Sequence, residues 1–286
     1  LRGDRDGNLD ALKGRRWDYC IDTCGYVPRI VKQSAQLLAD TVGHYLFVSS
    51  ISAYASHALV GDDETAALGT LEDESTEEIT GETYGPLKAL CERAIARHFP
   101  GRHAIVRPGL IVGPHDPSDR FSYWPHRIAQ GGPVLAPGKP ESPVQFIDVR
   151  DLAAWCIDLT LAQNADIFDA TGPAQPLNMG QLLTTCKKLS GSDAEFVWLG
   201  DDFLLEREVG PWMELPLWIP EGEKSMAGFQ QRNIAKALKA GLQTRPLADT
   251  LRDTLAWLAQ RPTDHLWKAG MAADKERAHL AAWTAR

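Results

Sequence analysis

The chain has 286 residues, 44% of them hydrophobic and 24% charged, and a formal net charge of −8. This length can bury a large core and holds one large domain or two smaller ones. The acidic balance argues against a binder of duplex nucleic acid or of a membrane surface, since such proteins carry basic patches, and so favours a small-molecule partner.

Apolar runs typical of strands alternate with helical patterns through the first half of the chain, which indicates a parallel sheet covered by helices. Pro28 fits the first turn of a helix whose Ile30, Val31, Leu37 and Leu38 would face the core. In chain order, we expect a strand end at residues 1–4, a short helix at 8–13, a strand at 19–24, a helix at 28–41 and a strand at 45–50.

The acidic stretch 61–82 has little apolar periodicity and predicts a surface loop or flap. Pro86 lacks an N–H group, so the helix that holds Lys88 and residues 90–97 must begin near residues 83–85. Strands are expected at 104–106, 144–147 and 167–170, and helices at 148–160, 233–240, 246–259 and 272–285. After Gly172 the sequence becomes rich in tryptophan and proline.

Tyr84 and Lys88 are the most informative pair in the sequence. Four residues apart at a helix start, they lie on one face, where the ammonium and the positive end of the helix dipole favour the ionised phenol. Ser49 and Ser50 end the preceding strand, and a serine there can hold a substrate hydroxyl or carbonyl. This arrangement is typical of hydride transfer to a nicotinamide, with Tyr84 as the proton-transfer group.

Six segments resemble the extended short-chain dehydrogenases/reductases of the NAD-dependent epimerase/dehydratase family, and the resemblance covers almost the whole chain. The segments are residues 3–5, 21–25, 47–50, the pair Tyr84 and Lys88, 107–109 with 113–114, and 146–153. The resemblance implies an α/β fold in which residues 1–172 form a Rossmann-like doubly wound parallel sheet that lacks its first strands. Residues 173–286 would form a smaller C-terminal substrate lobe, to which residues 113–144 would contribute.

The resemblance also implies roles for individual residues. Ser50, Tyr84 and Lys88 would be catalytic, and Lys88 would also hold the nicotinamide ribose. Asp4 would accept from the adenine amino group. The remaining cofactor-binding positions would be Thr23, Cys24, Gly25, Ser49, Pro108, Gly109 and Leu110. The cofactor would be NAD or NADP, and the substrate a small molecule of which nucleotide sugars are the commonest class; the resemblance also allows a homodimer.

One family feature is missing from the sequence. Family members begin with a strand, a G-x-x-G-x-x-G turn and a helix, whose backbone N–H groups hold the cofactor pyrophosphate. No such turn occurs here, so we expect poor nucleotide affinity and interpret the sequence as a truncated member. The helix asparagine that supports proton transfer in many relatives has no clear equivalent, with Gln33 and Ser34 as the nearest substitutes.

Several segments have plainer interpretations. Asp148, Arg150 and Asp151 fit a helix start and local pairing better than a site. Residues 115–124 fit a ligand-binding loop and a packed surface loop equally well. Trp198, Trp212 and Trp218 favour core packing over a sugar platform.

The sequence also bears on partners and compartment. The five cysteines lack metal-type spacing and favour a reduced, cytoplasmic protein without a metal site; they are Cys20, Cys24, Cys91, Cys156 and Cys186. No stretch predicts a transmembrane helix or a secretory signal. The alternative function is a non-catalytic or RNA-associated protein on the same scaffold, which a basic stripe on the folded surface would support.

Overall fold

The computed structural model describes residues 1–262 and 264–286, which divide into two compact units. The first unit comprises residues 1–109, 150–171 and 232–243, and the second comprises 110–149, 172–231 and 244–286. Residues 232–243, which we expected in the C-terminal lobe, therefore belong to the first unit.

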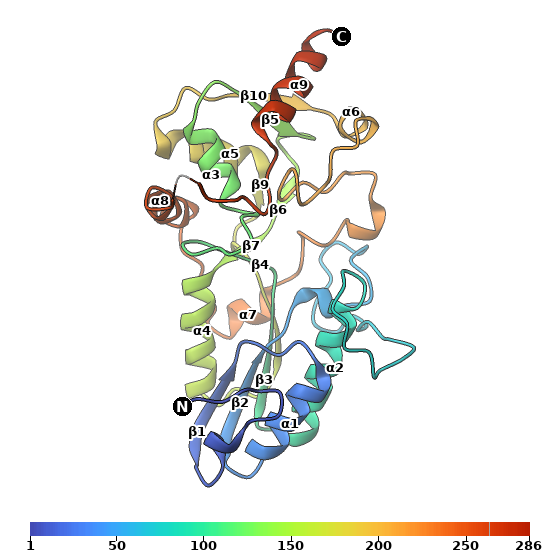
Figure 1. The fold of residues 1–286 in the computed structure, drawn as a ribbon, viewed down its shortest axis with the longest axis vertical. Helices are drawn as coiled ribbons and strands as arrows, with labels where there is room; N and C mark the ends of the chain where they lie inside the picture. The colour runs from blue at the N-terminus through green and yellow to red at the C-terminus, as the bar shows by residue number, and fades with distance from the viewer. Residues whose placement is uncertain (263) are drawn as a thin grey trace. The chain divides into compact units, whose positions relative to one another are not determined.

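The first unit is built on a four-stranded parallel sheet in the order β1-β2-β3-β8, of which Figure 1 labels the first three strands. Its strands are β1 (Trp17–Asp22), β2 (Val42–Val48), β3 (His103–Pro108) and β8 (Ile167–Ala170). Its helices are α1 (Pro28–Leu38), α2 (Tyr84–His98), most of α4 (Val149–Leu161) and α7 (Ala235–Lys239), with 3-10 turns η1 (Asp10–Leu12) and η2 (Ile51–Ala53). The expected α/β class and parallel sheet are confirmed.

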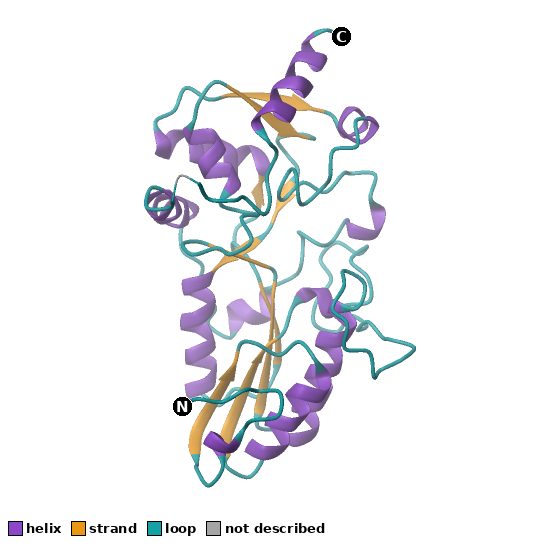
Figure 2. Ribbon diagram, viewed as in Figure 1, coloured by secondary structure: helices purple, strands orange, loops and turns teal. Residues whose placement is uncertain are grey.

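Helices cover both faces of this sheet, α1 and α2 on one side and α4 on the other (Figure 2). Val31 and Leu38 of α1 are buried as expected, while Ile30 and Leu37 are only half-buried. One apolar core lies beneath α1 and α2; its buried members are Val31, Ala35, Leu38, Val42, Tyr45, Phe47, Cys91, Ile95, Phe99 and Ile105. Most positions of β2 and β3 are buried, which explains the apolar runs at residues 45–48 and 104–106.

The expected strand end at residues 1–4 is wrong. Asp4 and Asn8 pair with each other across a tight turn, with N–H···O distances of 3.0 and 2.9 Å, and lie outside the sheet. The sequence analysis placed a strand end there as the first member of the alternating strand and helix pattern. Local hydrogen bonding within residues 4–8 satisfies the backbone instead.

The second unit combines short strand pairs with helices. Its strands are β4 (Leu110–Val112), β5 (Pro133–Pro137), β6 (Pro143–Val144), β7 (Phe146–Asp148), β9 (Leu177–Asn178) and β10 (Glu195–Leu199), paired as β4-β7, β5-β10 and β6-β9. Its helices are α3 (Tyr123–Ala129), α5 (Met179–Ser190), α6 (Asp201–Glu206), α8 (Leu247–Leu258) and α9 (Ala273–Thr284), with the 3-10 turn η3 (Lys224–Met226). A separate apolar core forms around the buried Phe121, Trp124 and Phe203.

Candidate active site

The carboxyl ends of β1 and β2 meet at one edge of the sheet, because the strands are parallel and adjacent. Ser49 and Ser50 follow β2 directly and are both buried. The Ser49 N–H donates to the carbonyl oxygen of Val106 on β3 at 2.7 Å. The Ser50 Oγ accepts from the N–H of Ser52 at 3.1 Å, which caps the following turn η2.

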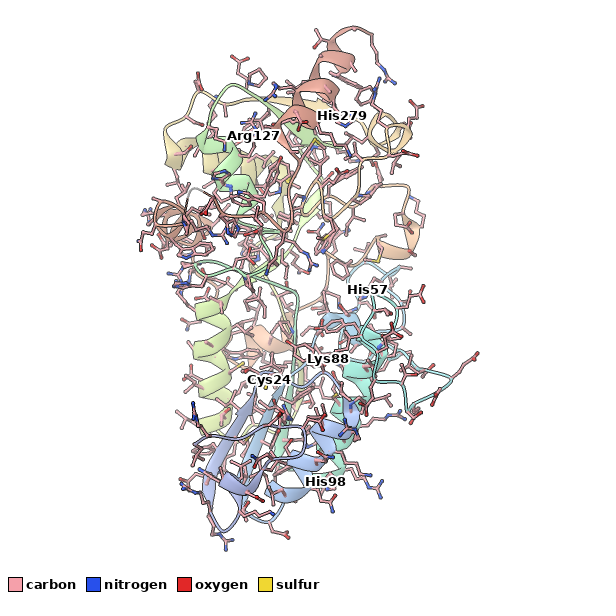
Figure 3. The ribbon with its side chains drawn as sticks, in the orientation of Figure 1. Cys24, His57, Lys88, His98, Arg127 and His279 are labelled. Atoms are coloured by element: carbon pink, nitrogen blue, oxygen red, sulfur yellow. The ribbon has the colours of Figure 1, made fainter. Side chains whose placement is uncertain are left out.

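Helix α2 begins at Tyr84, as the sequence predicted, and its first turn lies against η2. Gly85 is required at this contact, because a Cβ atom there would collide with the carbonyl oxygen of Ser52. Figure 3 shows α2 running from Lys88, near the strand ends, to His98 at the opposite end of the sheet. The packing therefore brings Ser50, Tyr84 and Lys88 to the same edge of the sheet.

Lys88 provides a buried positive charge at this edge of the sheet. Its side chain is buried, and its Nζ donates to the carbonyl oxygens of Gly25 at 2.7 Å and of Val48 at 2.8 Å. The ammonium also lies 4.3 Å from the centre of the Phe47 ring and 5.3 Å from that of Tyr26. Burial lowers the pKa of Lys88 to about 8. Two of its three N–H donors are used here, so one remains for another acceptor.

The turn after β1 carries three of the expected cofactor-binding residues, Thr23, Cys24 and Gly25. A Cβ atom on Gly25 would lie 2.8 Å from the Val31 side chain and would clash with the Phe47 ring. The absence of a side chain thus lets the Gly25 carbonyl approach Lys88. The Cys24 N–H donates to Asp22 Oδ1 at 3.2 Å, which fixes the turn to the end of β1.

Asp22 anchors this turn through an ion pair that the sequence analysis missed. The Arg5 guanidinium donates to both Asp22 oxygens, at 2.6 and 2.5 Å, and the Tyr45 hydroxyl donates to the same carboxylate at 2.7 Å. Burial raises the pKa of Asp22, but hydrogen bonds from Arg5 and Tyr45 and the Arg5 charge outweigh it and lower the pKa below its usual value. The signal in the sequence was Asp22 itself, because a carboxylate within the apolar strand predicted at residues 19–24 needs a partner.

Three further residues were singled out in the sequence: Asp4, Gln33 and Ser34. Asp4 is exposed, and its Oδ1 accepts from the N–H of Asp6 at 2.9 Å within the turn. Ser34 accepts from Arg5 at 2.9 Å, whereas Gln33 is exposed. The adenine contact of Asp4 and the proton-transfer role of Gln33 or Ser34 therefore stay predictions.

A second buried network, also missed, lies beside η2. The ring of Tyr54 is stacked by the guanidinium groups of Arg232, at 3.9 Å, and Arg107, at 4.7 Å. The Tyr54 hydroxyl donates to Asp169 Oδ1 at 2.6 Å and accepts from Arg107 at 2.9 Å, while Arg107 forms a bidentate pair with Glu92. The network ties β3, β8 and α2 to the turn that follows Ser50.

The third group of expected residues, 108–110, spans the boundary of the two units. Gly109 leaves little room for a side chain, because a Cβ atom there would lie 2.5 Å from Thr171 Oγ1. Its N–H donates to the carbonyl of Ala170 at 3.1 Å, which continues the pairing of β3 with β8. Pro108 ends β3, and Leu110 begins β4 in the second unit.

The acidic side chains of loop 115–124 are bound by other residues of the second unit. Asp116 accepts from Ser118 and Ser122, and Asp119 accepts from His265 Nε2 and the Lys268 N–H, both at 3.0 Å. These bonds favour the packed-loop interpretation. The Asp148 carboxylate accepts from the hydroxyl of Thr250 at 2.7 Å, which agrees with the structural role predicted for it.

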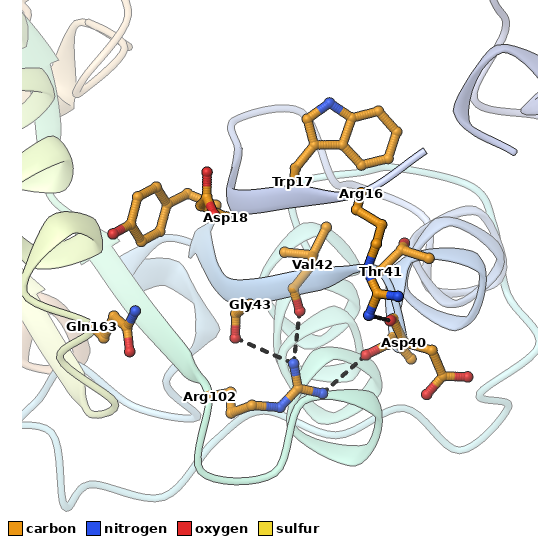
Figure 4. Close-up of a pocket in the computed structure, with 11 residues that line it drawn as sticks. Arg16, Trp17, Asp18, Asp40, Thr41, Val42, Gly43, Arg102 and Gln163 are labelled. Carbon is orange, nitrogen blue, oxygen red and sulfur yellow. Dashed lines mark hydrogen bonds between the residues drawn. The ribbon is translucent and has the colours of Figure 1, made fainter. Parts of the chain in front are cut away.

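A polar hollow of about 700 Å³ lies at the opposite end of the sheet, beside the amino ends of β1 and β2 (Figure 4). Its Arg102 guanidinium already donates to the carbonyl oxygens of Ala39, Val42 and Gly43, as the dashed lines show. The hollow therefore presents cations that are largely engaged by the backbone. We place the candidate active site at the other end.

Within residues 1–262 and 264–286, no group of three or more histidine, cysteine, aspartate or glutamate side chains is placed to hold a metal ion. No helix in that part of the chain is both long and apolar enough to cross a membrane.

Solved structures with this architecture are numerous, although no protein-family model and no curated protein sequence matches the chain. RMD from Pseudomonas aeruginosa, solved with NADPH, is 17% identical, covers 90% of this chain and 87% of its own, and superposes with a TM-score of 0.59. The chain has the extended short-chain dehydrogenase/reductase fold.

Two nucleotide-sugar epimerases share this fold. The UDP-Glc/GlcNAc 4-epimerase from Campylobacter jejuni is 16% identical, with a TM-score of 0.58 over 82% of this chain and 70% of that one. The UDP-glucuronic acid 4-epimerase from Bacillus cereus, in complex with NAD, is 14% identical, with a TM-score of 0.54 over 81% of this chain. The chain spans 66% of the length of the Bacillus epimerase.

Proposed function

We propose that the protein is an NAD(P)-dependent epimerase, dehydratase or reductase that acts on a hydroxyl or carbonyl group of a small molecule. The observation that carries this proposal is the buried Lys88 ammonium, which binds the carbonyl oxygens of Gly25 and Val48 one helical turn from Tyr84. The shared fold of epimerases solved with NAD supports the same class. Within that class, nucleotide sugars are the first substrates to test.

Each of the three side chains has a distinct task. Tyr84 exchanges the proton of the reacting hydroxyl through its Oη. Lys88 stabilises the phenolate by its charge, because an ammonium held at low solvent exposure is weakly screened. Ser50 orients the substrate oxygen, since its hydroxyl can donate while its oxygen accepts from Ser52.

The residues at this edge fit the nicotinamide half of a dinucleotide. The hydroxyls of Ser49 and Thr171 are buried and have no partner within the described residues, and Lys88 retains one N–H for a ribose hydroxyl. The nicotinamide would supply the hydride acceptor or donor. The pyrophosphate half is not matched, because the sequence has no G-x-x-G-x-x-G turn.

Two substitutions test the proposal by separating proton transfer from cofactor binding. At cofactor concentrations high enough to load a weak site, we expect Tyr84→Phe to abolish turnover of a nucleotide-sugar panel while cofactor affinity stays within a few-fold of that of the unsubstituted chain, because only the proton-transfer group is lost. Lys88→Met should lower both, since Lys88 serves the ribose and Tyr84 alike. NADH and NADPH titrations followed by nicotinamide fluorescence measure the affinity.

The controls use residues away from this edge. Tyr19→Phe on β1 and Lys32→Met on α1 change the same chemical groups and should leave both properties unchanged. A Tyr84→Phe protein that keeps most of its kcat would overturn the catalytic assignment. A Lys88→Met protein with normal cofactor affinity and only lower stability would make Lys88 a structural residue.

A further inference from the structure

The second unit contains an aromatic cavity that the proposed reaction does not use. It has a volume of about 580 Å³, within the range of small-molecule sites, and it is formed entirely by residues 205–229. Trp212, Trp218 and Phe229 contribute rings to its lining, and Met226 adds a polarisable side chain. A single ionisable side chain, Glu223, lies among the lining residues.

The aromatic rings are held in fixed positions. Trp212 packs edge-on against Phe229, with ring centres 5.2 Å apart and planes at 87°. The indole N–H of the buried Trp218 donates to Asp201 Oδ1 at 2.9 Å, so a carboxylate polarises that ring. Rigid rings lose little entropy when a ligand binds.

The backbone between α6 and η3 carries conformational strain. Glu208, Trp212 and Leu217 have φ angles of 53°, 64° and 66°, in the left-handed region that favours glycine. The chain reinforces this shape with a hydrogen bond from the Trp212 N–H to the Trp218 carbonyl, at 3.2 Å. Strained non-glycine residues concentrate at ligand-binding segments, because the rest of the fold must stabilise them.

The charges around the cavity are mainly negative. Residues 201–226 include seven acidic and two basic side chains. Both bases are engaged elsewhere: the Lys224 Nζ donates to the Glu221 carbonyl at 3.1 Å, and the Arg207 guanidinium lies 4.6 Å from the centre of the Phe203 ring. Three of the acids pair with bases from other segments: Glu206 with Arg286, Glu214 with Lys275 and Glu221 with Lys139. The seven acids still outnumber these five bases, so the electrostatic potential of the segment favours a cation.

Elsewhere the chain covers aromatic faces with its own cations. Arg261 stacks on Trp257 at 4.2 Å, and Arg286 stacks on Phe203 at 4.4 Å. Across residues 1–262 and 264–286, no lysine or arginine stacks on Trp212 or Trp218. The ring faces of Trp212 and Trp218 are therefore available to a cationic ligand.

We propose that this cavity binds a small organic cation through a methylated ammonium group, with Trp212 and Trp218 facing the cation and Glu223 neutralising its charge. Quaternary ammonium groups suit such a site, because they are weakly hydrated and interact with several ring faces at once. The site needs neither the nicotinamide cofactor nor Tyr84. Its test is therefore independent of the proposed reaction.

The experiment compares choline with its neutral isostere, 3,3-dimethylbutan-1-ol, by titration calorimetry on the whole chain. The two molecules have nearly the same shape, so a difference in affinity measures the contribution of the charge. We expect choline to bind about tenfold more tightly, which is the scale of a partly desolvated cation–π interaction. Equal binding of the two, or no binding of choline at about 10 mM, would overturn the proposal.

Variants locate the binding. Trp212→Leu keeps an apolar side chain but removes a ring, and should weaken choline binding about tenfold. Glu223→Gln, at an exposed position that cannot disturb the core, should weaken it a few-fold and reduce its salt dependence. Trp17→Leu in the first unit and Glu208→Gln are the matched controls. Unchanged binding in both test variants, or equal losses in the controls, would place the cation elsewhere and reject this site.

Discussion

The burial of the Lys88 ammonium should make the unfolding free energy depend on pH. Its pKa is lowered to about 8 by burial, whereas an unfolded lysine titrates near 10.5. Between these values the unfolded chain binds more protons than the folded one, so the Lys88 contribution to the unfolding free energy rises with pH across that interval. Below pH 8, both states are protonated and the cost of burying the charge is fully present.

Urea denaturation at pH 7, 8, 9 and 10 tests this linkage. The unfolding free energy of the natural chain minus that of Lys88→Met should increase with pH, by up to about 3 kcal/mol. Lys32→Met, at an exposed position on α1, should give a difference independent of pH. A flat difference for Lys88→Met would mean that the ammonium is solvated in the folded protein.

Gly25 gives a second prediction at the residue scale. Gly25→Ala places a methyl group against Phe47 and Val31 and moves the carbonyl that binds Lys88. We expect a loss of about 1–3 kcal/mol in unfolding free energy, typical of overpacking, together with weaker cofactor binding. Gly81→Ala is the matched control, because no atom lies within 4 Å of its Cβ position. Equal losses of unfolding free energy for Gly25→Ala and Gly81→Ala would show that the close contact of Gly25 with Phe47 and Val31 does not affect stability.

At the scale of elements, the sequence predicted most of the first unit. Proline at position 28 and the missing N–H of Pro86 marked the starts of α1 and α2, and continuous apolar runs marked β2 and β3. These signals are local, so they survive without knowledge of tertiary contacts. The loop at 61–82 also lacks helices and strands, as its composition indicated.

The buried ion networks could not be predicted in the same way. Arg5 meets Asp22, and Arg232 meets Asp169, across separations of 17 and 63 residues. No spacing rule connects such distant partners; only the folded sheet brings them together. The same reason hides the cavity around Trp212, which the sequence indicated only as a tryptophan-rich segment.

The buried ion pair of Arg232 and Asp169 leads us to predict a large loss of stability when Arg232 is replaced. Arg232 donates to Asp169 Oδ2 from Nε at 2.8 Å, and both side chains are buried. Burial raises the pKa of Asp169 to about 6, even though the charge of Arg232 and the Tyr54 hydroxyl oppose the rise. Arg232→Met should cost about 3–5 kcal/mol at pH 8, because it leaves a buried carboxylate unpaired.

Lowering the pH should reduce the loss of unfolding free energy that Arg232→Met causes. Without Arg232, the pKa of Asp169 rises further, and the folded protein takes up a proton that the unfolded chain binds only near pH 4. The destabilisation by Arg232→Met should therefore be smaller at pH 5 than at pH 8, as measured by urea denaturation at both values. Arg252→Met, which breaks the exposed pair with Asp249, should cost less than about 0.5 kcal/mol at either pH. A pH-independent loss for Arg232→Met would show that its role is packing alone.

At the scale of the whole molecule, each compact unit has an apolar core of its own. Phe99 is fully buried in the core beneath α1 and α2, and Phe121 is fully buried in the core of the second unit. A unit with its own core can unfold as a cooperative body, so a substitution inside one core should act first on that unit.

Calorimetry of two matched variants tests this expectation. Phe99→Ala and Phe121→Ala each remove a buried ring at a cost of about 3–5 kcal/mol, which corresponds to roughly 10 °C in the unfolding temperature of a body of about 150 residues. Each variant should lower the temperature of one component of the heat-capacity curve and leave the other nearly in place. A single transition that shifts as a whole in both variants, with equal calorimetric and van't Hoff enthalpies, would show that the two cores unfold as one cooperative body.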